Sequence, residues 1–230
     1  MRTMSPIPNL LNDDGSASIA TALMTSHHGF RRDLAQFAAA LRRLAAGDTA
    51  RLQPLREEWT HFRGKLHGHH QAEDAGLFPS LRAQQPRLAA VIDGLGADHR
   101  RIDPLLEQGD HAFAELPATT AAAAELIGRL QTLLAPHLAT EETQLFPLLR
   151  DAKQFPPFAT DDELAMFADG FAWSSHGIAP DIIERLYAIL PAALVSRLPA
   201  ACAAFAARCE RVWGSAQAGA SRTPVPDWIE

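Results

Sequence analysis

The sequence predicts an all-α protein: an antiparallel up-down four-helix bundle followed by a C-terminal helical extension. Three observations support this fold class. Apolar residues recur every three or four positions along four long stretches, which is the spacing of one face of an α-helix. The connections between these stretches are short, which favours antiparallel neighbours. No stretch shows the strict alternation that predicts a half-buried β-strand.

Four helices are expected in the first two thirds of the chain. Gly47 suits the end of the first helix, and Pro54 suits the first turn of the second. Pro104 lies inside the third helix and is expected to bend it. The four expected helices cover about residues 18–46, 54–81, 87–116 and 119–150.

The rest of the chain predicts further helices and two tails. Thr160 and Glu163 have the spacing of a capping box, so a helix is expected to begin there. Later helices should extend to about Trp213, with breaks at Pro191 and Pro199. The expected parts are a flexible tail at 1–17, the bundle at 18–152, a helical extension packed on the bundle at 153–214 and a loose tail at 215–230.

The composition limits the class of protein and its partners. The 230 residues carry a formal net charge of −6 and are 47% hydrophobic, close to globular averages. The acidic balance, without a basic cluster, argues against a nucleic-acid partner. No run of 18 apolar residues predicts a membrane span. The start of the chain lacks the apolar segment of a signal peptide, so we expect a cytoplasmic protein with reduced cysteines.

Histidine is the one residue type in excess, and it takes part in an internal repeat. The chain has ten histidines and a single tyrosine. The segment from His69 to Pro79 matches the segment from His137 to Pro147 at a constant offset, which is 68 residues from His69 to His137. His27 and His99 correspond more weakly, 72 residues apart. The bundle is therefore expected to consist of two similar helix hairpins.

Six polar residues are expected to point into the bundle. Residues four apart share one helix face, so each copy of the repeat presents an imidazole beside a carboxylate, in phase with an apolar stripe. Such groups are costly to bury unless something satisfies them. A pair of metal ions would do so, because imidazole and carboxylate ligands suit iron, manganese or zinc. The six residues are His27, His69, Glu73, His99, His137 and Glu141.

These segments resemble the hemerythrin-like proteins with the HHE cation-binding domain. The resemblance covers about residues 18 to 150 and is carried by HHGFRRDL at His27, HHQAEDAGLFP at His69, DHRRIDPLL at His99 and HLATEETQLFP at His137. It implies a non-haem centre of two iron ions (Fe²⁺/Fe³⁺, oxo- or hydroxo-bridged), with manganese or zinc as other candidates. It also implies dioxygen or another small diatomic molecule as the ligand.

Carried over by position, the resemblance implies terminal nitrogen ligands at His27, His69, His99 and His137, with Glu73 and Glu141 as bridging carboxylates. Oxygen-carrying hemerythrins have a second histidine one turn after the third-helix histidine, and this chain has Asp103 there. His70, Asp74, Asp103 or Glu142 could supply the missing ligand. We favour His70, which completes the predicted set of metal-binding residues.

The other histidines carry no functional prediction. His28 is in phase with charged residues and is expected to point away from the bundle interior. We give ordinary structural roles to the remaining four, which are His61, His67, His111 and His176.

Two functions stay open at this point, with a metal-free helical module as a weaker third. The favoured one is a di-iron protein that binds or senses oxygen, nitric oxide or iron. The alternative is a di-iron oxidase, peroxidase or oxygenase whose C-terminal extension covers the site as a lid, with Phe171, Trp173 and His176 as lid residues. We assign no catalytic residue, and the oligomeric state is not predicted.

Overall fold

The computed structural model describes residues 9–155 and 158–214, and no strand occurs within these ranges. This confirms the all-α class. The α-helices are α1 (Ile19–Ala45), α2 (Leu52–Ala72), α3 (Phe78–Gln84), α4 (Ala89–Ala114), α5 (Thr120–Thr140), α6 (Asp161–Ser175), α7 (Pro180–Tyr187), α8 (Ala192–Val195) and α9 (Leu198–Trp213). Short π- or 3₁₀-helical turns are η1 (Glu73–Leu77), η2 (Pro86–Leu88), η3 (Glu141–Leu145) and η4 (Phe146–Leu149).

The chain divides into two compact units. Unit 1 comprises residues 1–32 and 138–230, and unit 2 comprises residues 33–137. The boundaries fall within α1 and α5, so each of these two helices contributes to both units.

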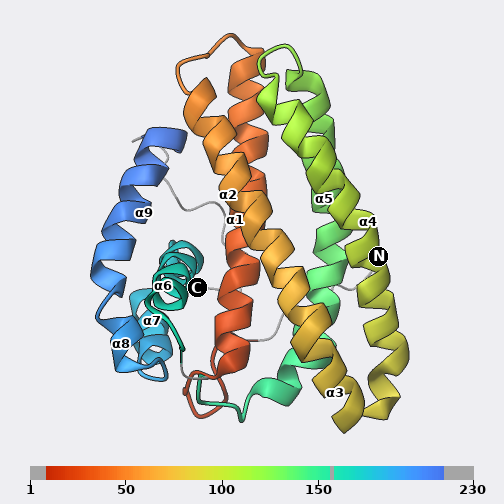
Figure 1. Cartoon of the computed structure of the whole chain (residues 1–230), viewed down its shortest axis with the longest axis vertical. Helices are drawn as coiled ribbons and strands as arrows, with labels where there is room; N and C mark the ends of the chain where they lie inside the picture. The colour runs from red at the N-terminus through yellow and green to blue at the C-terminus, as the bar shows by residue number, and fades with distance from the viewer. Residues whose placement is uncertain (1–8, 156–157, 215–230) are drawn as a thin grey trace. The chain divides into compact units, whose positions relative to one another are not determined.

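Aromatic side chains form the centre of the unit 2 core. Trp59 of α2 stacks on Phe113 of α4, with ring centroids 4.5 Å apart. Phe37 of α1 meets the rings of Trp59 and Phe113 edge-on, a geometry that aromatic pairs prefer. The indole Nε1 of Trp59 donates a hydrogen bond to Asp110. These contacts join α1, α2 and α4 (Figure 1), and they use the apolar stripes that predicted the helices.

A π-helical turn interrupts the second predicted helix. We expected one helix over 54–81, whereas α2 ends at Ala72 and the turn η1 precedes α3. The N–H of Phe78 bonds to the carbonyl of Glu73, five residues earlier. Pro79 follows immediately, and a proline ring clashes with the carbonyl four residues before it in a regular α-helix. Widening the helix at this point relieves that clash.

The same interruption recurs in the fourth predicted helix. Here α5 ends at Thr140, and the π-helical turn η3 is followed by the 3₁₀ turn η4. The N–H of Phe146 bonds to the carbonyl of Glu141, and Pro147 comes next. The two copies of the sequence repeat therefore share a π-helical turn, which begins at Glu73 in one and at Glu141 in the other.

The C-terminal helices pack together within unit 1. The predicted capping box of α6 is present, because the Thr160 hydroxyl accepts from the Glu163 N–H and the Glu163 carboxylate accepts from the Thr160 N–H. Helix α6 contacts α8 and α9 (Figure 1) around a core that includes Phe171 and Leu194. Pro191 precedes α8 as expected. The break expected at Pro199 lies just before it: α8 ends at Val195, and Pro199 is in the first turn of α9, where a helix needs no N–H.

Residues 9–17 differ from the flexible tail that we expected. Leu10 and Ala17 are buried. The Thr21 hydroxyl donates to the carbonyl of Leu10 at 2.7 Å, and the Arg150 guanidinium donates to the carbonyl of Leu11 at 2.8 Å. This segment is therefore fixed to other parts of unit 1. The remainder of that expected tail, and the expected tail at 215–230, lie outside the described residues.

His28 does not point outward as predicted. It is buried, and its Nε2 lies 3.2 Å from the carbonyl oxygen of His176. Buried Arg32, on the same face of α1, donates to the carbonyls of Trp173 and His176. Between them, a Cβ on Gly29 would lie 2.6 Å from the Trp173 ring, so only glycine lets the ring approach. The charged pattern of this face was misleading because the end of α6 covers it.

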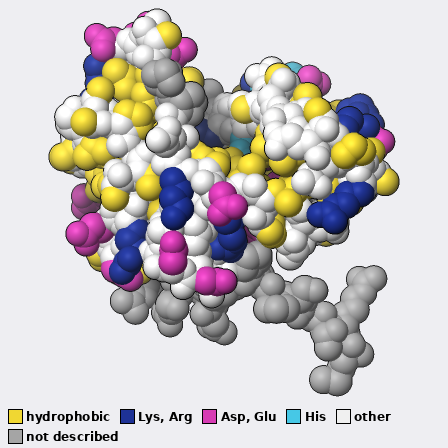
Figure 2. Space-filling model, turned by 90° about the horizontal axis from the view of Figure 1, so that it is seen from below, with side chains coloured by type: hydrophobic (Ala, Val, Ile, Leu, Met, Phe, Trp, Pro, Cys, Tyr) yellow, Lys and Arg dark blue, Asp and Glu magenta, His cyan; other side chains and the backbone are white. Residues whose placement is uncertain are grey.

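The described helices include none long and apolar enough to cross a bilayer. On the face drawn in Figure 2, basic and acidic side chains are interspersed, and no extended basic patch appears among the described residues shown there. Cys202 and Cys209 are not joined in a disulfide, and Cys209 is buried whereas Cys202 is partly buried.

Candidate metal centre

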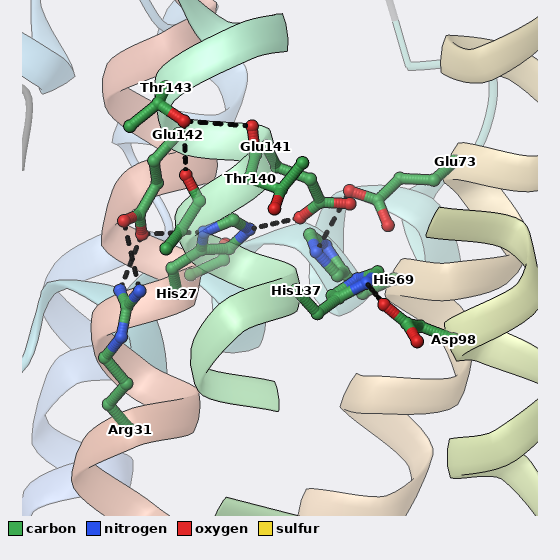
Figure 3. A network of polar contacts seen from close by, with 12 residues as sticks. His27, Arg31, His69, Glu73, Asp98, His137, Thr140, Glu141, Glu142 and Thr143 are labelled. Atoms are coloured by element: carbon green, nitrogen blue, oxygen red, sulfur yellow. Dashed lines mark hydrogen bonds and ion pairs between the residues drawn. The ribbon is translucent and has the colours of Figure 1, made fainter. Parts of the chain in front are cut away.

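In unit 2, the predicted pair His69 and Glu73 lies side by side. The imidazole Nε2 of His69 is 3.1 Å from Oε1 of Glu73, as the four-residue spacing predicts. Glu73 is buried, although it is a carboxylate at the first position of the π-helical turn η1. Figure 3 shows both side chains pointing toward each other from the end of α2.

His99 and His137 meet in the interior of the same unit. Their Nε2 atoms are 3.3 Å apart, and both side chains are buried. Nε2 of His99 also lies 3.6 Å from Oε2 of Glu73. Glu73 of η1 and His137 of α5 therefore both lie close to the Nε2 atom of His99 on α4.

His70 joins this group. Its ring is buried and stacks on that of His99, with centroids 4.0 Å apart and an interplanar angle of 15°. His70, His99 and His137 each offer one ring nitrogen, and these nitrogens lie within 4.8 Å of one another. The three nitrogens, that of the favoured His70 included, are thus close enough together for one metal ion to contact all of them.

In unit 1, two consecutive carboxylates face the two nitrogens of His27. Nε2 of His27 is 3.2 Å from Oε2 of Glu141, and Nδ1 is 2.9 Å from Oε1 of Glu142. All three side chains have 0% exposure. Arg31, one turn after His27 on α1, binds both oxygens of Glu142 at 2.6 and 3.0 Å. Figure 3 shows this row from Arg31 through Glu142 and His27 to Glu141.

The two carboxylates dominate the electrostatics of His27. Burial alone would lower the pKa of the imidazole, but hydrogen bonds to Glu141 and Glu142, and the charges of both, raise it above its ordinary value. Burial would likewise raise the pKa of Glu142, but His27 and Arg31 outweigh it and hold that pKa below its ordinary value. Glu142 is therefore a carboxylate anion paired with a guanidinium.

The two units contain the same arrangement, which we call half-site A in unit 1 and half-site B in unit 2. In half-site A, Glu141 faces Nε2 of His27 and Glu142 faces Nδ1. Half-site B repeats this at His99, where Glu73 faces Nε2 and Asp74 faces Nδ1, the latter at 3.0 Å. Each half-site thus has one imidazole between two adjacent acids from a π-helical turn. The sequence repeat is a repeat of this geometry.

The structure separates the four alternatives that the sequence left open for the missing ligand. Asp74 and Glu142 face the Nδ1 atoms of His99 and His27. Asp103 faces Nδ1 of His70 at 3.3 Å. Each of these acids contacts the Nδ1 atom of a histidine, on the opposite side of the ring from Nε2. Carboxylates commonly hydrogen-bond in this way to the second ring nitrogen of a metal-bound histidine. His70 alone of the four belongs to the grouped imidazole nitrogens.

Two further residues that support the predicted ligands or their acidic partners were not predicted from the sequence. Asp98 places Oδ2 3.8 Å from Nδ1 of His137, and Arg31 binds Glu142. The repeat already aligned Glu142 with Asp74, but it gave no sign of which histidine nitrogen either acid would contact.

The donor atoms fit a metal ion. With metal–nitrogen and metal–oxygen bonds of about 2.1 Å, two ligands at right angles have donor atoms about 3.0 Å apart. The measured separations are 3.1 Å for His69 and Glu73, 3.2 Å for His27 and Glu141 and 3.3 Å for His99 and His137. Buried imidazole nitrogens and carboxylate oxygens at these distances are a donor set suited to iron, manganese or zinc.

The expected lid residues are engaged in packing within unit 1. Phe171 belongs to a buried apolar cluster. Trp173 is buried against Phe30, with ring centroids 4.9 Å apart, and the ring of His176 packs edge-on against Phe205. Of the histidines without a predicted function, partly exposed His67 has its Nδ1 3.8 Å from Oδ1 of Asp103.

Comparison with known proteins defines the class. Residues 18–149, more than half of the chain, match the model of the hemerythrin HHE cation binding domain. The chain therefore belongs to the hemerythrin HHE cation binding domain family. The match covers every predicted metal-binding residue, and it agrees with the buried histidine and glutamate groups of both half-sites.

Three curated mycobacterial proteins are similar over part of the chain. One is an uncharacterized protein of Mycobacterium bovis, and two are uncharacterized proteins from strains of Mycobacterium tuberculosis. Each is 31% identical over 135 residues, which is 56% of this chain and 52% of the relative. The chain thus matches about half the length of these relatives. No solved structure matches.

Proposed function

We propose that the chain is a di-iron protein of hemerythrin type that binds dioxygen or a related small molecule such as nitric oxide. The observation that carries this proposal is the duplicated half-site, in which a buried imidazole lies between two adjacent acids in each unit. One such group could be a satisfied polar contact. Two copies, within the region that matches a cation-binding family, favour a pair of ions.

The family and the repeat also favour the four-helix bundle. In the proposed fold α1, α2, α4 and α5 run up and down and present the ligands to one interior, with α6 to α9 as an added helical layer. Terminal nitrogens would come from the histidines and bridging oxygens from Glu73 and Glu141. The proposed ligands are His27, His69, His70, His99 and His137, with Glu73 and Glu141.

The protein's own residues would fix these ligands in place. His70, stacked on His99 and held at Nδ1 by Asp103, would supply the imidazole that oxygen-carrying hemerythrins have at the position of Asp103. Iron, when bound, supplies redox chemistry toward dioxygen or nitric oxide. The aliphatic and aromatic residues of both units keep the surroundings apolar, and an apolar shell limits solvent access to a metal site.

Metal analysis tests the proposal. Protein loaded anaerobically with Fe²⁺ and freed of excess metal should contain about two iron ions per chain, as expected for a di-iron bundle. A His70→Ala variant should bind iron more weakly than a His67→Ala variant, because His67 is a partly exposed neighbour on the same helix and does not belong to the grouped imidazoles. Iron content near zero in the unmodified chain would contradict the proposal.

The reaction of the reduced, iron-loaded protein with oxygen separates binding from catalysis. A stable oxygenated spectrum that reverses when oxygen is removed supports the binding function. Rapid irreversible oxidation, or turnover of added peroxide, would instead support the enzyme alternative. The packing of Trp173 within unit 1 favours binding, because this side chain is buried against Phe30 and is not available to contact a substrate.

A further inference from the structure

Half-site A contains a carboxylate that is not in the proposed ligand set. Glu142 has 0% exposure, and Arg31 binds both of its oxygens. Its Oε1 atom also contacts Nδ1 of His27, on the opposite side of the ring from Glu141. Burying a carboxylate is unfavourable unless it is paired and hydrogen-bonded. The carboxylate of Glu142, compensated by Arg31, therefore contacts the Nδ1 atom of the proposed ligand His27.

This contact determines which nitrogen of His27 can bind metal. A carboxylate anion only accepts hydrogen bonds, so a neutral His27 must carry its proton on Nδ1 to bond with Glu142. In this tautomer Nε2 carries the lone pair that can bind a metal ion, and Nε2 is the atom that faces Glu141 at 3.2 Å. A ring with one nitrogen held in this way also cannot rotate without losing the bond.

We infer that Glu142, itself held by Arg31, is a positioning residue that fixes the tautomer and orientation of His27 so that Nε2 binds the metal. This inference rests on the proposed metal-binding function. It concerns a contact that lies wholly within unit 1, between the N-terminal half of α1 and the turn η3.

Half-site B provides an internal comparison. Asp74 contacts Nδ1 of His99 just as Glu142 contacts that of His27, but its side chain is 51% exposed. The position equivalent to Arg31, one turn after His99, is Asp103, which contacts His70 instead. Water can replace an exposed carboxylate far more easily than a buried one. Loss of the carboxylate charge should therefore matter more at Glu142 than at Asp74.

Zinc is the probe for the test, because it is diamagnetic and accepts the same ligand types. In Zn²⁺-loaded, ¹⁵N-histidine-labelled protein, NMR should show His27 with a proton on Nδ1 and Nε2 bound to metal. Glu142→Gln should lower Zn²⁺ affinity about 10- to 100-fold, the range for groups behind metal ligands. The matched change Asp74→Asn should lower it less. Affinity is measured by competition with a chromophoric chelator.

Arg31 provides a second, independent test. Arg31→Gln should also weaken zinc binding, because it leaves the buried Glu142 anion without its guanidinium. The double variant Arg31→Gln, Glu142→Gln should lose less affinity than the product of the two single losses, since it removes both charges together. Circular dichroism and thermal melts of all variants identify any that fail to fold, and the NMR assignment of the unmodified chain does not depend on them.

The outcomes separate this inference from the proposed function. Zinc uptake by the unmodified chain that is unaffected by Glu142→Gln would overturn the inference and leave the metal site standing. A proton on Nε2 of His27, with Nδ1 bound to metal, would do the same. No zinc uptake by the unmodified chain would overturn both.

Discussion

A chain with both Glu73 and Glu141 replaced by alanine is expected to lose nearly all of its iron. The change removes the inner carboxylate from each half-site, the one that faces the Nε2 atom of a histidine. Imidazoles alone cannot neutralise a divalent or trivalent ion, and carboxylates are the ligands that bridge two ions in di-iron bundles. We expect iron content to fall from about two ions per chain to near zero after anaerobic loading and gel filtration.

A matched control separates ligand loss from loss of negative charge. Glu57 on α2 and Glu125 on α5 are exposed, so replacing both with alanine changes the net charge equally without touching either half-site. This control should keep its full iron content. If the Glu73→Ala, Glu141→Ala chain also keeps its iron while remaining folded, the assignment of the half-sites is wrong.

Gly109→Ala is expected to destabilise the protein, although alanine is normally the better residue inside a helix. A Cβ on Gly109 would lie 2.0 Å from Cζ2 of Trp59. The Trp59 ring cannot easily move, because it is buried, stacks on Phe113 and donates to Asp110. Overpacking of this kind costs about 1–3 kcal/mol, measured as the free energy of unfolding in urea.

Gly94→Ala on the same helix is the control, and its expected effect has the opposite sign. Nothing lies within 4 Å of a Cβ at Gly94, so the change should add only the helix preference of alanine, roughly 0.5–1 kcal/mol of stability. Equal effects of the two changes would mean that the contact between α2 and α4 at Trp59 is not as close as described.

Features that depend on local geometry could be predicted from the sequence. The period of the apolar residues located the helices, and the four-residue spacing of His69 and Glu73 placed both side chains on one helix face, where they are 3.1 Å apart. The capping box at Thr160 is present for the same reason. The internal repeat also predicted that similar groups would occur twice, because similar short segments adopt the same turn before proline.

Features that depend on a second element could not be predicted. Asp74 and Glu142 were candidates for the missing ligand, and only the positions of the helices that carry His99 and His27 show that each faces an Nδ1 atom. Arg32 lies on a face of α1 that looks solvent-exposed in the sequence. It is buried because it donates to the last carbonyls of α6, more than 140 residues later.

The half-sites differ in ways that the similarity of their sequences does not reveal. Arg31 compensates Glu142 in half-site A, whereas half-site B has Asp103 at the corresponding place and an extra imidazole, His70, beside it. Asp103, which replaces the second histidine of the oxygen-carrying pattern, thus contacts His70, a histidine that lies close to His99 and His137. Half-site B is the richer in nitrogen, and half-site A has the more deeply buried carboxylates.

Anomalous diffraction from crystals of the iron-loaded protein, recorded at the iron absorption edge, tests the central claim most directly. We predict two iron peaks per chain, one bound through Nε2 of His27 and an oxygen of Glu141, the other through His99, His137 and Glu73. Iron bound elsewhere, or a single peak that contacts only one half-site, would contradict the claim that the duplicated half-sites hold a di-iron centre.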